Sequence, residues 1–323
     1  MRKVFGHKSP SEGRTPPPAV TGHSQQGFVI VVVLLVTAVL VAIVVEFAYN
    51  VYLSTARAGN FKDSQRAGLL AGRSVEFAGA AVEGLLKRKP NLTIEKDGLV
   101  FFEVEEDMTV TIKVADEMGK LSLRTVYEKT GVKNAAVYDE YSRLLKNLDI
   151  EGRRGLEEAL ADWIDMDDEP RLYGAEAADY RNARPGPYRP GNSYLESVDD
   201  LLMLKGYSPE VHGRISPFVS VYNTSGLVNV NTAPKDVLMA LSDDMTEDLA
   251  GRIIDYRAET PFKDRSDIMK VPGFERIGFD LQDKIAVSSD MFRIYSKVAS
   301  GDITRQAEAV YSIKRGFLFW RDM

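Results

Sequence analysis

The chain has 323 residues, a formal net charge of −6 and no cysteine. These values exclude disulfide bonds and thiolate metal sites, and the bulk charge does not indicate a nucleic-acid partner. Of the three histidines, His7 and His23 lie in the N-terminal leader, so only His212 remains for the rest of the chain. Neither a zinc site nor a histidine-based catalytic triad is convincingly built from one histidine, and we expect no enzymatic activity.

An apolar run from Phe28 to Val45 is interrupted only by Thr37. As a helix, this run would be about 27 Å long, close to the thickness of the hydrocarbon core of a bilayer. The sequence that follows, Glu46 to Asn50, is a poor match to the cleavage site of a secretory signal. We therefore predict a transmembrane helix, and the basic residues on its two sides give a small bias toward a cytoplasmic leader.

Gly27 directly precedes this run. A polar leader followed by glycine, phenylalanine and a long apolar helix resembles the class III signal of type IV pilin-like proteins. The resemblance implies that a prepilin peptidase cuts after Gly27, so that residues 1–27 are a removed leader and Phe28 begins the mature chain. Two features depart from the common pattern: no Lys or Arg directly precedes Gly27, and Val32 occupies the fifth mature position, where most pilins carry Glu.

The helical pattern continues beyond the apolar run. Apolar and small residues recur at three- and four-residue steps from Ala67 to Leu86, which predicts one buried face of an amphipathic helix. Basic residues followed by Pro90 are typical of a helix end. We therefore predict one helix over residues 28–90, with its first half in lipid and its second half packed on a protein core.

Alternating apolar and polar residues predict half-buried strands in two separated parts of the chain, residues 91–125 and 289–323. The expected strands are 99–106, 108–117 and a shorter one at 120–125 in the first part, and 293–301 and 305–316 in the second. The predicted fold class is α+β. A long helix on a small antiparallel sheet is the pilin-like architecture, and a second domain is expected to be inserted between residues 126 and 288.

The inserted domain is predicted to be all-α and to contain an internal repeat. Residues 197–207 and 264–274 align, and each has a short helix that ends at a glycine and turns into a second helix. Helix-hairpin-helix units have this form. DNA-binding units of this kind use glycine-rich turns and basic side chains, but residues 227–285 carry eight Lys or Arg against twelve Asp or Glu, a balance of −4. We therefore expect no nucleic-acid binding.

Seven acidic residues lie within residues 162–179, offset only by Arg171. Closely spaced carboxylates in a loop supply the oxygen ligands that calcium takes, although the spacing is not that of an EF-hand. Trp163 and Ile164 would anchor the loop to a core. A solvated acidic loop remains the alternative. The expected calcium ligands are Asp162, Asp165, Asp167 and Glu176, with Asp168 and Asp179 as second choices.

Several motifs occur together and in a specific order. They are Gly27-Phe28 with Val32, "VADEMGKLSL", "ADWIDMDDEP" followed by "GAEAADY", "YRPGNSYLESVDDLLMLKGYSPE" and "VNVNTAP". Together they resemble the large minor pseudopilins of type II secretion systems, over nearly the whole chain from Gly27.

The resemblance implies a non-enzymatic, single-pass protein of the bacterial inner membrane with a periplasmic C-terminal domain. It would lie at the tip of a short pseudopilus that helps to push folded proteins through the outer membrane. The implied partners are two other minor pseudopilins, the major pseudopilin, the prepilin peptidase and the inner-membrane secretion platform. The resemblance also implies calcium in the inserted domain, here at residues 162–176. A minor pilin of a related type IV uptake or adhesion filament is the alternative.

Overall fold

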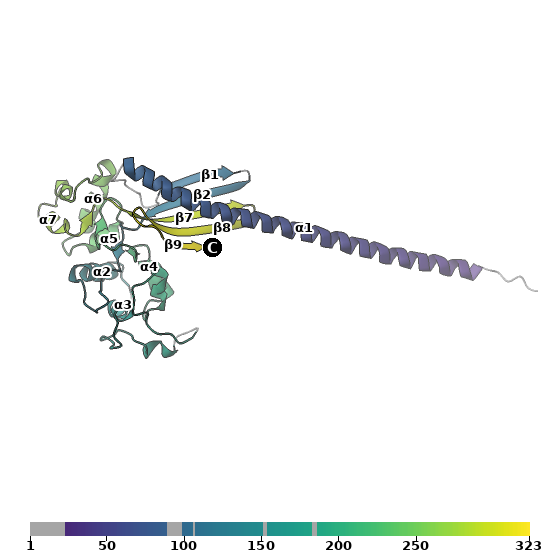
Figure 1. The fold of residues 1–323 in the computed structure, drawn as a ribbon, viewed down its shortest axis with the longest axis horizontal. Helices are drawn as coiled ribbons and strands as arrows, with labels where there is room; N and C mark the ends of the chain where they lie inside the picture. The colour runs from purple at the N-terminus through teal and green to yellow at the C-terminus, as the bar shows by residue number, and fades with distance from the viewer. Residues whose placement is uncertain (1–22, 89–98, 106, 151–153, 183–185) are drawn as a thin grey trace, which may run out of the picture. The chain divides into compact units, whose positions relative to one another are not determined.

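The computed structural model describes residues 23–88, 99–105, 107–150, 154–182 and 186–323. The chain forms two compact units, residues 1–61 and 62–323. Most of the predicted leader, residues 1–22, lies outside the described residues. The elements are labelled in Figure 1.

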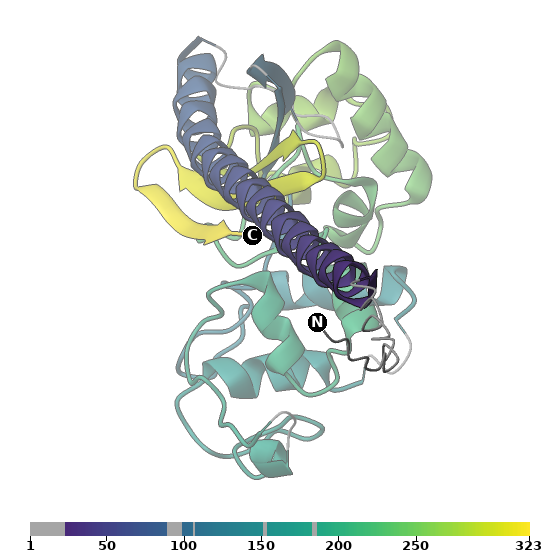
Figure 2. The same ribbon diagram turned by 90° about the vertical axis from the view of Figure 1, so that its right-hand side faces the viewer.

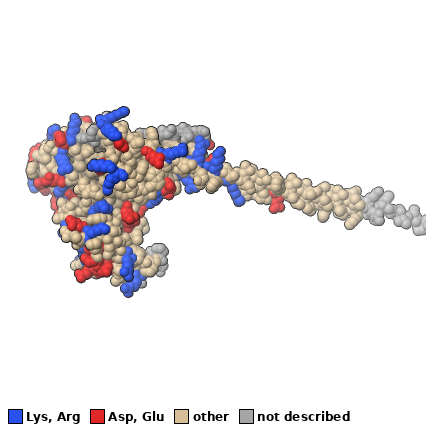
Figure 3. Space-filling view, in the orientation of Figure 1, with Lys and Arg blue, Asp and Glu red and all other residues tan. Residues whose placement is uncertain are grey.

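The helix α1 (His23–Arg88) belongs to both units. In the first unit it exposes apolar side chains, with Phe28, Leu35 and Val44 at 71%, 64% and 64% exposure. The hydroxyl of Thr37 donates to the carbonyl oxygen of Val33 at 2.9 Å, so this polar side chain is satisfied within the helix. Figure 3 shows that this part of the helix is almost free of charge. Among the described residues, α1 is the one helix long and apolar enough to cross a membrane.

In the second unit, α1 buries one face on a sheet. Its fully buried positions follow three- and four-residue steps: Ala67, Ala71, Val75, Ala78 and Val82. Three of these are alanines, and their small side chains let the helix approach the sheet closely. The buried face confirms the amphipathic pattern predicted for this stretch.

The sheet has five antiparallel strands in the order β1-β2-β7-β8-β9. The strands are β1 (Leu99–Glu105), β2 (Met108–Asp116), β7 (Met291–Ser300), β8 (Ile303–Ser312) and β9 (Gly316–Asp322). Alternate residues such as Ile112, Ile294 and Ala309 are buried against α1. Figures 1 and 2 show the second half of α1 lying along this sheet.

The segment between β2 and β7, residues 117–290, is called the inserted lobe, and the rest of the second unit is called the sheet lobe. The helices of the inserted lobe are α2 (Ala135–Asn147), α3 (Leu156–Ile164), α4 (Pro209–Ile215), α5 (Lys235–Ala240), α6 (Glu247–Glu259) and α7 (Gly278–Leu281). Three 3-10 helices are η1 (Asp179–Asn182), η2 (Val198–Met203) and η3 (Arg265–Lys270). A large apolar core holds these elements together.

The prediction of an all-α inserted domain is wrong. Within the predicted range 126–288, β5 (Val228–Asn229) pairs in parallel with β6 (Ile285–Ala286). A third strand in this range, β4 (Val219–Ser220), pairs in parallel with β3 (Leu121–Ser122), which lies just before it. Of the strand predicted at 120–125, only Leu121 and Ser122 are extended, and they pair with β4 and do not join the main sheet. Leu121 and Leu123 are buried in the core of the inserted lobe, and this burial decides the partner.

The two copies of the internal repeat have closely similar local geometry. The 3-10 helices η2 and η3 each begin with a capping box, formed by Ser197 with Asp200 and by Asp264 with Asp267. The turns that follow contain Gly206 and Gly273, whose φ angles are 90° and 93°. This left-handed conformation favours glycine, which explains why both copies carry one at this position.

Candidate metal centre

The acidic segment is held on the core by the end of α3. Trp163 and Ile164, in the last turn of α3, are 6% and 1% exposed. The Trp163 ring packs edge-on against Tyr180 at a centroid distance of 6.0 Å. The predicted anchoring of the loop by these apolar residues is confirmed. Figure 3 shows acidic residues gathered at the end of the inserted lobe that carries α3.

Asp162 organises the loop and is fully buried. Its carboxylate accepts the backbone N–H groups of Arg171 at 3.1 Å and Ala175 at 2.8 Å, and the Arg171 guanidinium at 2.6 Å. A Cβ atom at Gly174 would lie 2.0 Å from the Asp162 carboxylate, so only glycine fits there. Asp162 therefore folds the chain back on itself, and most of its oxygen lone pairs are already used.

Three other carboxylates converge next to this turn. Single oxygen atoms of Asp165, Asp167 and Glu176 all lie within 4.8 Å of one another. Asp165 and Glu176 are 1% and 3% exposed, and Asp167 is exposed. Among the described residues, both oxygens of Glu176 and Oδ1 of Asp165 have no hydrogen-bond partner. Buried carboxylate oxygens without partners are costly, and a hard cation is the group that would satisfy them.

Burial and like charges act together on this cluster. Burial, followed by repulsion from the neighbouring aspartates, raises the pKa of Glu176 to about 7. Burial also raises the pKa of Asp165, although the guanidinium of Arg171 opposes the change. Arg171 contacts both Asp162 and Asp165, so its one positive charge is shared within the cluster. The remaining negative charge favours either a proton or a metal ion.

The second-choice residues lie elsewhere. Asp168 is exposed and is not part of the converging group. Asp179 pairs with Lys205 at 3.0 Å and accepts the backbone N–H of Glu176 at 3.2 Å, so it positions Glu176 from outside the cluster. Sequence spacing did not reveal the role of Gly174, although a glycine inside an acidic loop is a signal of close approach.

The predicted processing residues lie in the first unit. Gly27 and Phe28 are both within α1 and exposed. A Cβ atom at Gly27 would have no atom within 4 Å, so packing within the chain does not require glycine there.

The packed second half of α1 and the lobe inserted between two neighbouring strands define an α+β chain, and the first half of α1 is long and apolar enough to cross a membrane. Two family models described as type II secretion system (T2SS), protein K match residues 119–224 and 228–288, which together make up just over half of the chain. The chain belongs to the type II secretion system protein K family, and it is a minor pseudopilin of type II secretion.

Individual relatives agree with this family. The type II secretion system protein K of Pseudomonas aeruginosa is 30% identical, over 67% of this chain and 63% of that protein. The protein of the same name from Klebsiella pneumoniae is 28% identical, over 92% of this chain and 95% of that protein. A chain in the crystal structure of the GspK-GspI-GspJ complex from enterotoxigenic Escherichia coli shares the fold. Its TM-score is 0.67 at 17% identity, covering 83% of this chain and 99% of that one.

Proposed function

We propose that this minor pseudopilin lies at the tip of the type II secretion pseudopilus and supports the export of folded proteins across the outer membrane. The observation that carries the proposal is the inserted lobe of residues 117–290, added between β2 and β7 of a helix-on-sheet body. A lobe of this bulk would obstruct another subunit stacked above it, which favours an end position. Val32, in place of the usual Glu, also removes a carboxylate that would pair with a neighbouring subunit's terminal amine.

In the finer description of the fold, the sheet lobe is pilin-like and the inserted lobe contains two helix-hairpin-helix-like units. The packing of α1 on the five-stranded sheet supports the first part. The matched capping boxes and left-handed glycines of residues 197–207 and 264–274 support the second. In this account the repeats are structural and bind no nucleic acid, since the carboxylates outnumber the basic residues.

The proposed location is the bacterial inner membrane, with one membrane-spanning helix and the second unit in the periplasm. The proposed partners are two other minor pseudopilins, as in the GspK-GspI-GspJ complex of the structural relative. The major pseudopilin, the prepilin peptidase and the inner-membrane secretion platform complete the set. The role is structural and not enzymatic. Membership of the protein K family disfavours the alternative, a minor pilin of an uptake or adhesion filament.

A secretion assay in the source bacterium tests this function. Deletion of the gene is expected to retain type II exoproteins in the periplasm, and the wild-type chain is expected to restore their secretion. Val36→Arg should fail to restore it, because Arg near the centre of a membrane helix costs about 2.5–3.5 kcal/mol. Thr37→Val, which keeps the helix apolar, is the matched control. Normal secretion in the deletion strain would contradict the proposed function.

We further propose that the candidate metal centre binds calcium through Asp165, Asp167 and Glu176. Calcium prefers carboxylate and carbonyl oxygens, and two of these three side chains are buried with unpaired oxygens. Asp162 would hold the loop in shape through its bonds to backbone N–H groups, and Arg171 would balance the remaining charge. Bound calcium would supply the positive charge that lets Glu176 ionise at neutral pH.

The raised pKa of Glu176 predicts how stability depends on pH when calcium is removed by a chelator. The pKa of this carboxyl is raised from its ordinary value of 4.5 to about 7 in the folded chain. Its contribution to stability is therefore fully present below the ordinary pKa and is lost as the pH rises through about 7. Thermal melts with chelator should show a melting temperature that falls between about pH 5 and about pH 8. Glu176→Gln should flatten this dependence, and an unchanged slope in that variant would contradict the assignment.

A further inference from the structure

The inserted lobe is joined to the sheet lobe by two chain connections that run side by side. β2 ends at Asp116 and β7 begins at Met291, and these two strands are neighbours in the sheet. The backbone N–H of Glu117 donates to the carbonyl oxygen of Met291 at 3.1 Å, so the two connections remain paired just beyond the sheet. Two adjacent connections fix a line of attachment. On their own they would leave the inserted lobe free to swing about that line.

At this line, two consecutive buried carboxylates connect the lobes. Asp116 accepts hydrogen bonds from the side chains of Asn229 at 2.9 Å and Thr232 at 2.6 Å, both in the inserted lobe. Glu117 accepts from Ser220 at 2.6 Å on one side and from Arg293 of β7 at 2.7 Å on the other. These bonds lie close to the connections themselves. They fix where the two lobes are joined, but they are too close to the line of attachment to resist a rotation of the inserted lobe about it.

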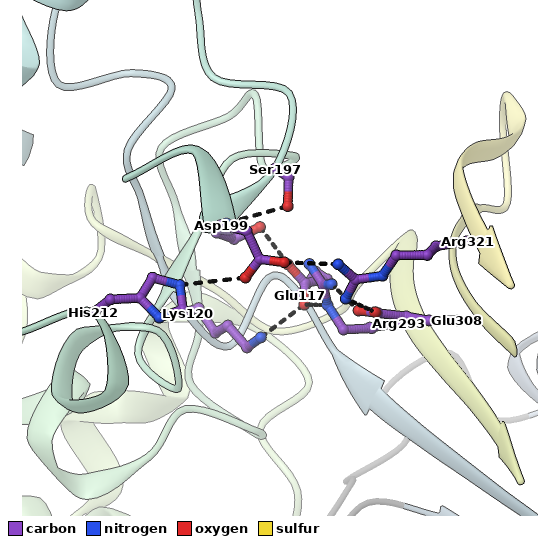
Figure 4. Close-up of polar contacts among 9 residues, drawn as sticks. Glu117, Lys120, Ser197, Asp199, His212, Arg293, Glu308 and Arg321 are labelled. Carbon is purple, nitrogen blue, oxygen red and sulfur yellow. Dashed lines mark hydrogen bonds and ion pairs between the residues drawn. The ribbon is translucent and has the colours of Figure 1, made fainter. Parts of the chain in front are cut away.

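A chain of charged residues leads away from this line across the sheet, as Figure 4 shows. Arg293 also contacts Glu308 on β8, and Glu308 contacts Arg321 on β9 at 2.6 Å. The other arm of Arg321 reaches Asp199, in η2 of the inserted lobe, at 2.8 Å. This series of ion pairs therefore returns to the inserted lobe at β9, two strands away from β7. Two strand spacings correspond to a displacement of about 10 Å.

The far end of this chain is supported on both lobes. Asp199 lies 3.3 Å from Nε2 of His212, on α4, whose side chain is only 17% exposed. His212 is therefore a mostly buried neighbour of Asp199. On the sheet side, the Phe319 ring of β9 lies 6.2 Å from the Tyr222 ring of the inserted lobe. Glu308 is buried, so the Arg321 guanidinium that pairs with it is held in place by more than a solvent-exposed contact.

We propose that the contact between Arg321 and Asp199 is a lock that stops the inserted lobe from swinging about its two connections. This contact lies two strands away from the line of attachment, where Val310, Leu318 and Phe319 of the sheet lobe also pack against the apolar core of the inserted lobe. Together with that packing, it resists a rotation that Asp116 and Glu117 cannot resist. The inserted lobe and the sheet lobe then move as one rigid body. A force applied to the inserted lobe is passed to the half of α1 that packs on the sheet, instead of being absorbed by a hinge.

Distance measurements between spin labels test the lock in the full chain held in detergent micelles. The chain has no cysteine, so Phe77→Cys on α1 and Glu275→Cys in the inserted lobe, both exposed, give one labelled pair. The proposal predicts a single narrow distance distribution for the labelled chain. Arg321→Met and, separately, Asp199→Asn should each broaden the distribution at least twofold. Both side chains are about half exposed, at 43% and 47%, so neither change should unfold the protein.

Arg252→Met is the matched control. Arg252 pairs with Asp248 of the same helix at the same distance of 2.8 Å and with a similar exposure of 44%. Its other hydrogen bond, to the carbonyl oxygen of Pro272 at 3.0 Å, also stays within the inserted lobe. The distance distribution of the Arg252→Met variant should stay as narrow as that of the labelled parent chain. A broad or two-peaked distribution in the parent would overturn the proposal, because the lobes would then swing with the lock in place. Unchanged narrow distributions in both lock variants would overturn it as well.

Discussion

Millimolar calcium is expected to raise the melting temperature of the wild-type chain, and Glu176→Gln is expected to abolish most of that rise. Glu176 is 3% exposed, both its oxygens lack partners, and four neighbouring aspartates repel its charge. A ligand that binds only the folded state stabilises it by about 2.7 kcal/mol at one hundred times its Kd. Glu176→Gln removes a ligand charge and keeps the size of the side chain. It should also raise the melting temperature in chelator, because it removes the repulsion.

The second variant and the control separate a metal site from a general effect of acidic charge. Asp165→Ala should also weaken calcium binding. Unlike Glu176→Gln, it should lower stability in chelator, because it removes an ion-pair partner of Arg171. Asp243→Asn is the control, because Asp243 is 86% exposed and lies far along the sequence in the α5–α6 turn. The calcium-induced rise in the melting temperature of the Asp243→Asn variant should equal that of the wild type. Identical wild-type melting temperatures in chelator and in millimolar calcium would show that the loop is only a solvated acidic surface.

Processing in the source bacterium is expected to give a mature chain that begins at Phe28, and Gly27→Val is expected to prevent that cleavage. Gly27 lies in α1 with open space around its Cβ position, so valine would meet no steric obstacle within the fold. Loss of cleavage would then reflect the fit to the prepilin peptidase, which must accept backbone without a Cβ at this position. Intact mass and N-terminal sequencing of the membrane-extracted protein measure the outcome.

Gly59→Val is the matched control for this change, because Gly59 lies in the same helix and also has no atom within 4 Å of its Cβ position. It should be cleaved like the wild type. A wild-type N-terminus at Met1, or one beyond residue 50, would contradict processing after Gly27. In that case, the two departures from the common signal, an absent basic residue before Gly27 and Val32 at the fifth mature position, would explain the failure of cleavage after Gly27.

Helical periodicity in the sequence predicted α1 well, because the burial or exposure of its residues depends only on their type and their spacing along the helix. Positions from Ala67 to Val82 recur at helical steps, and those steps coincide with the face buried on the sheet. The apolar run before them is exposed on all sides, and its length and composition are sufficient to cross a membrane. Both properties follow from residue type and spacing alone, so no information about distant residues was needed.

Strand pairing was harder to predict because it depends on residues far away in the chain. The extended segment at Leu121 was recognised, but its partner β4 lies almost one hundred residues later. The edge strand β9 was missed, since residues 316–322 do not alternate clearly between apolar and polar side chains. Its position is set by pairing with β8 and by the contacts of Phe319 and Arg321.

The candidate metal centre shows the same limit at a smaller scale. Spacing identified the acidic segment, and the structure brings Asp165, Asp167 and Glu176 together. Spacing could not show that Asp162 is occupied by the backbone N–H groups of Arg171 and Ala175. A carboxylate that shapes a loop and one that faces an open position look alike in a sequence, and they differ only in which hydrogen bonds the fold provides.

The most direct test of the central claim is whether the second unit, residues 62–323, assembles with the two other minor pseudopilins of the same secretion system. The soluble domains would be co-expressed in the periplasm, purified through a tag on one partner, and analysed by native mass spectrometry. If this chain is a minor pseudopilin of the pseudopilus tip, we expect a 1:1:1 complex that contains it. Recovery of the two partners together without this chain, while it remains folded and soluble, would contradict that role.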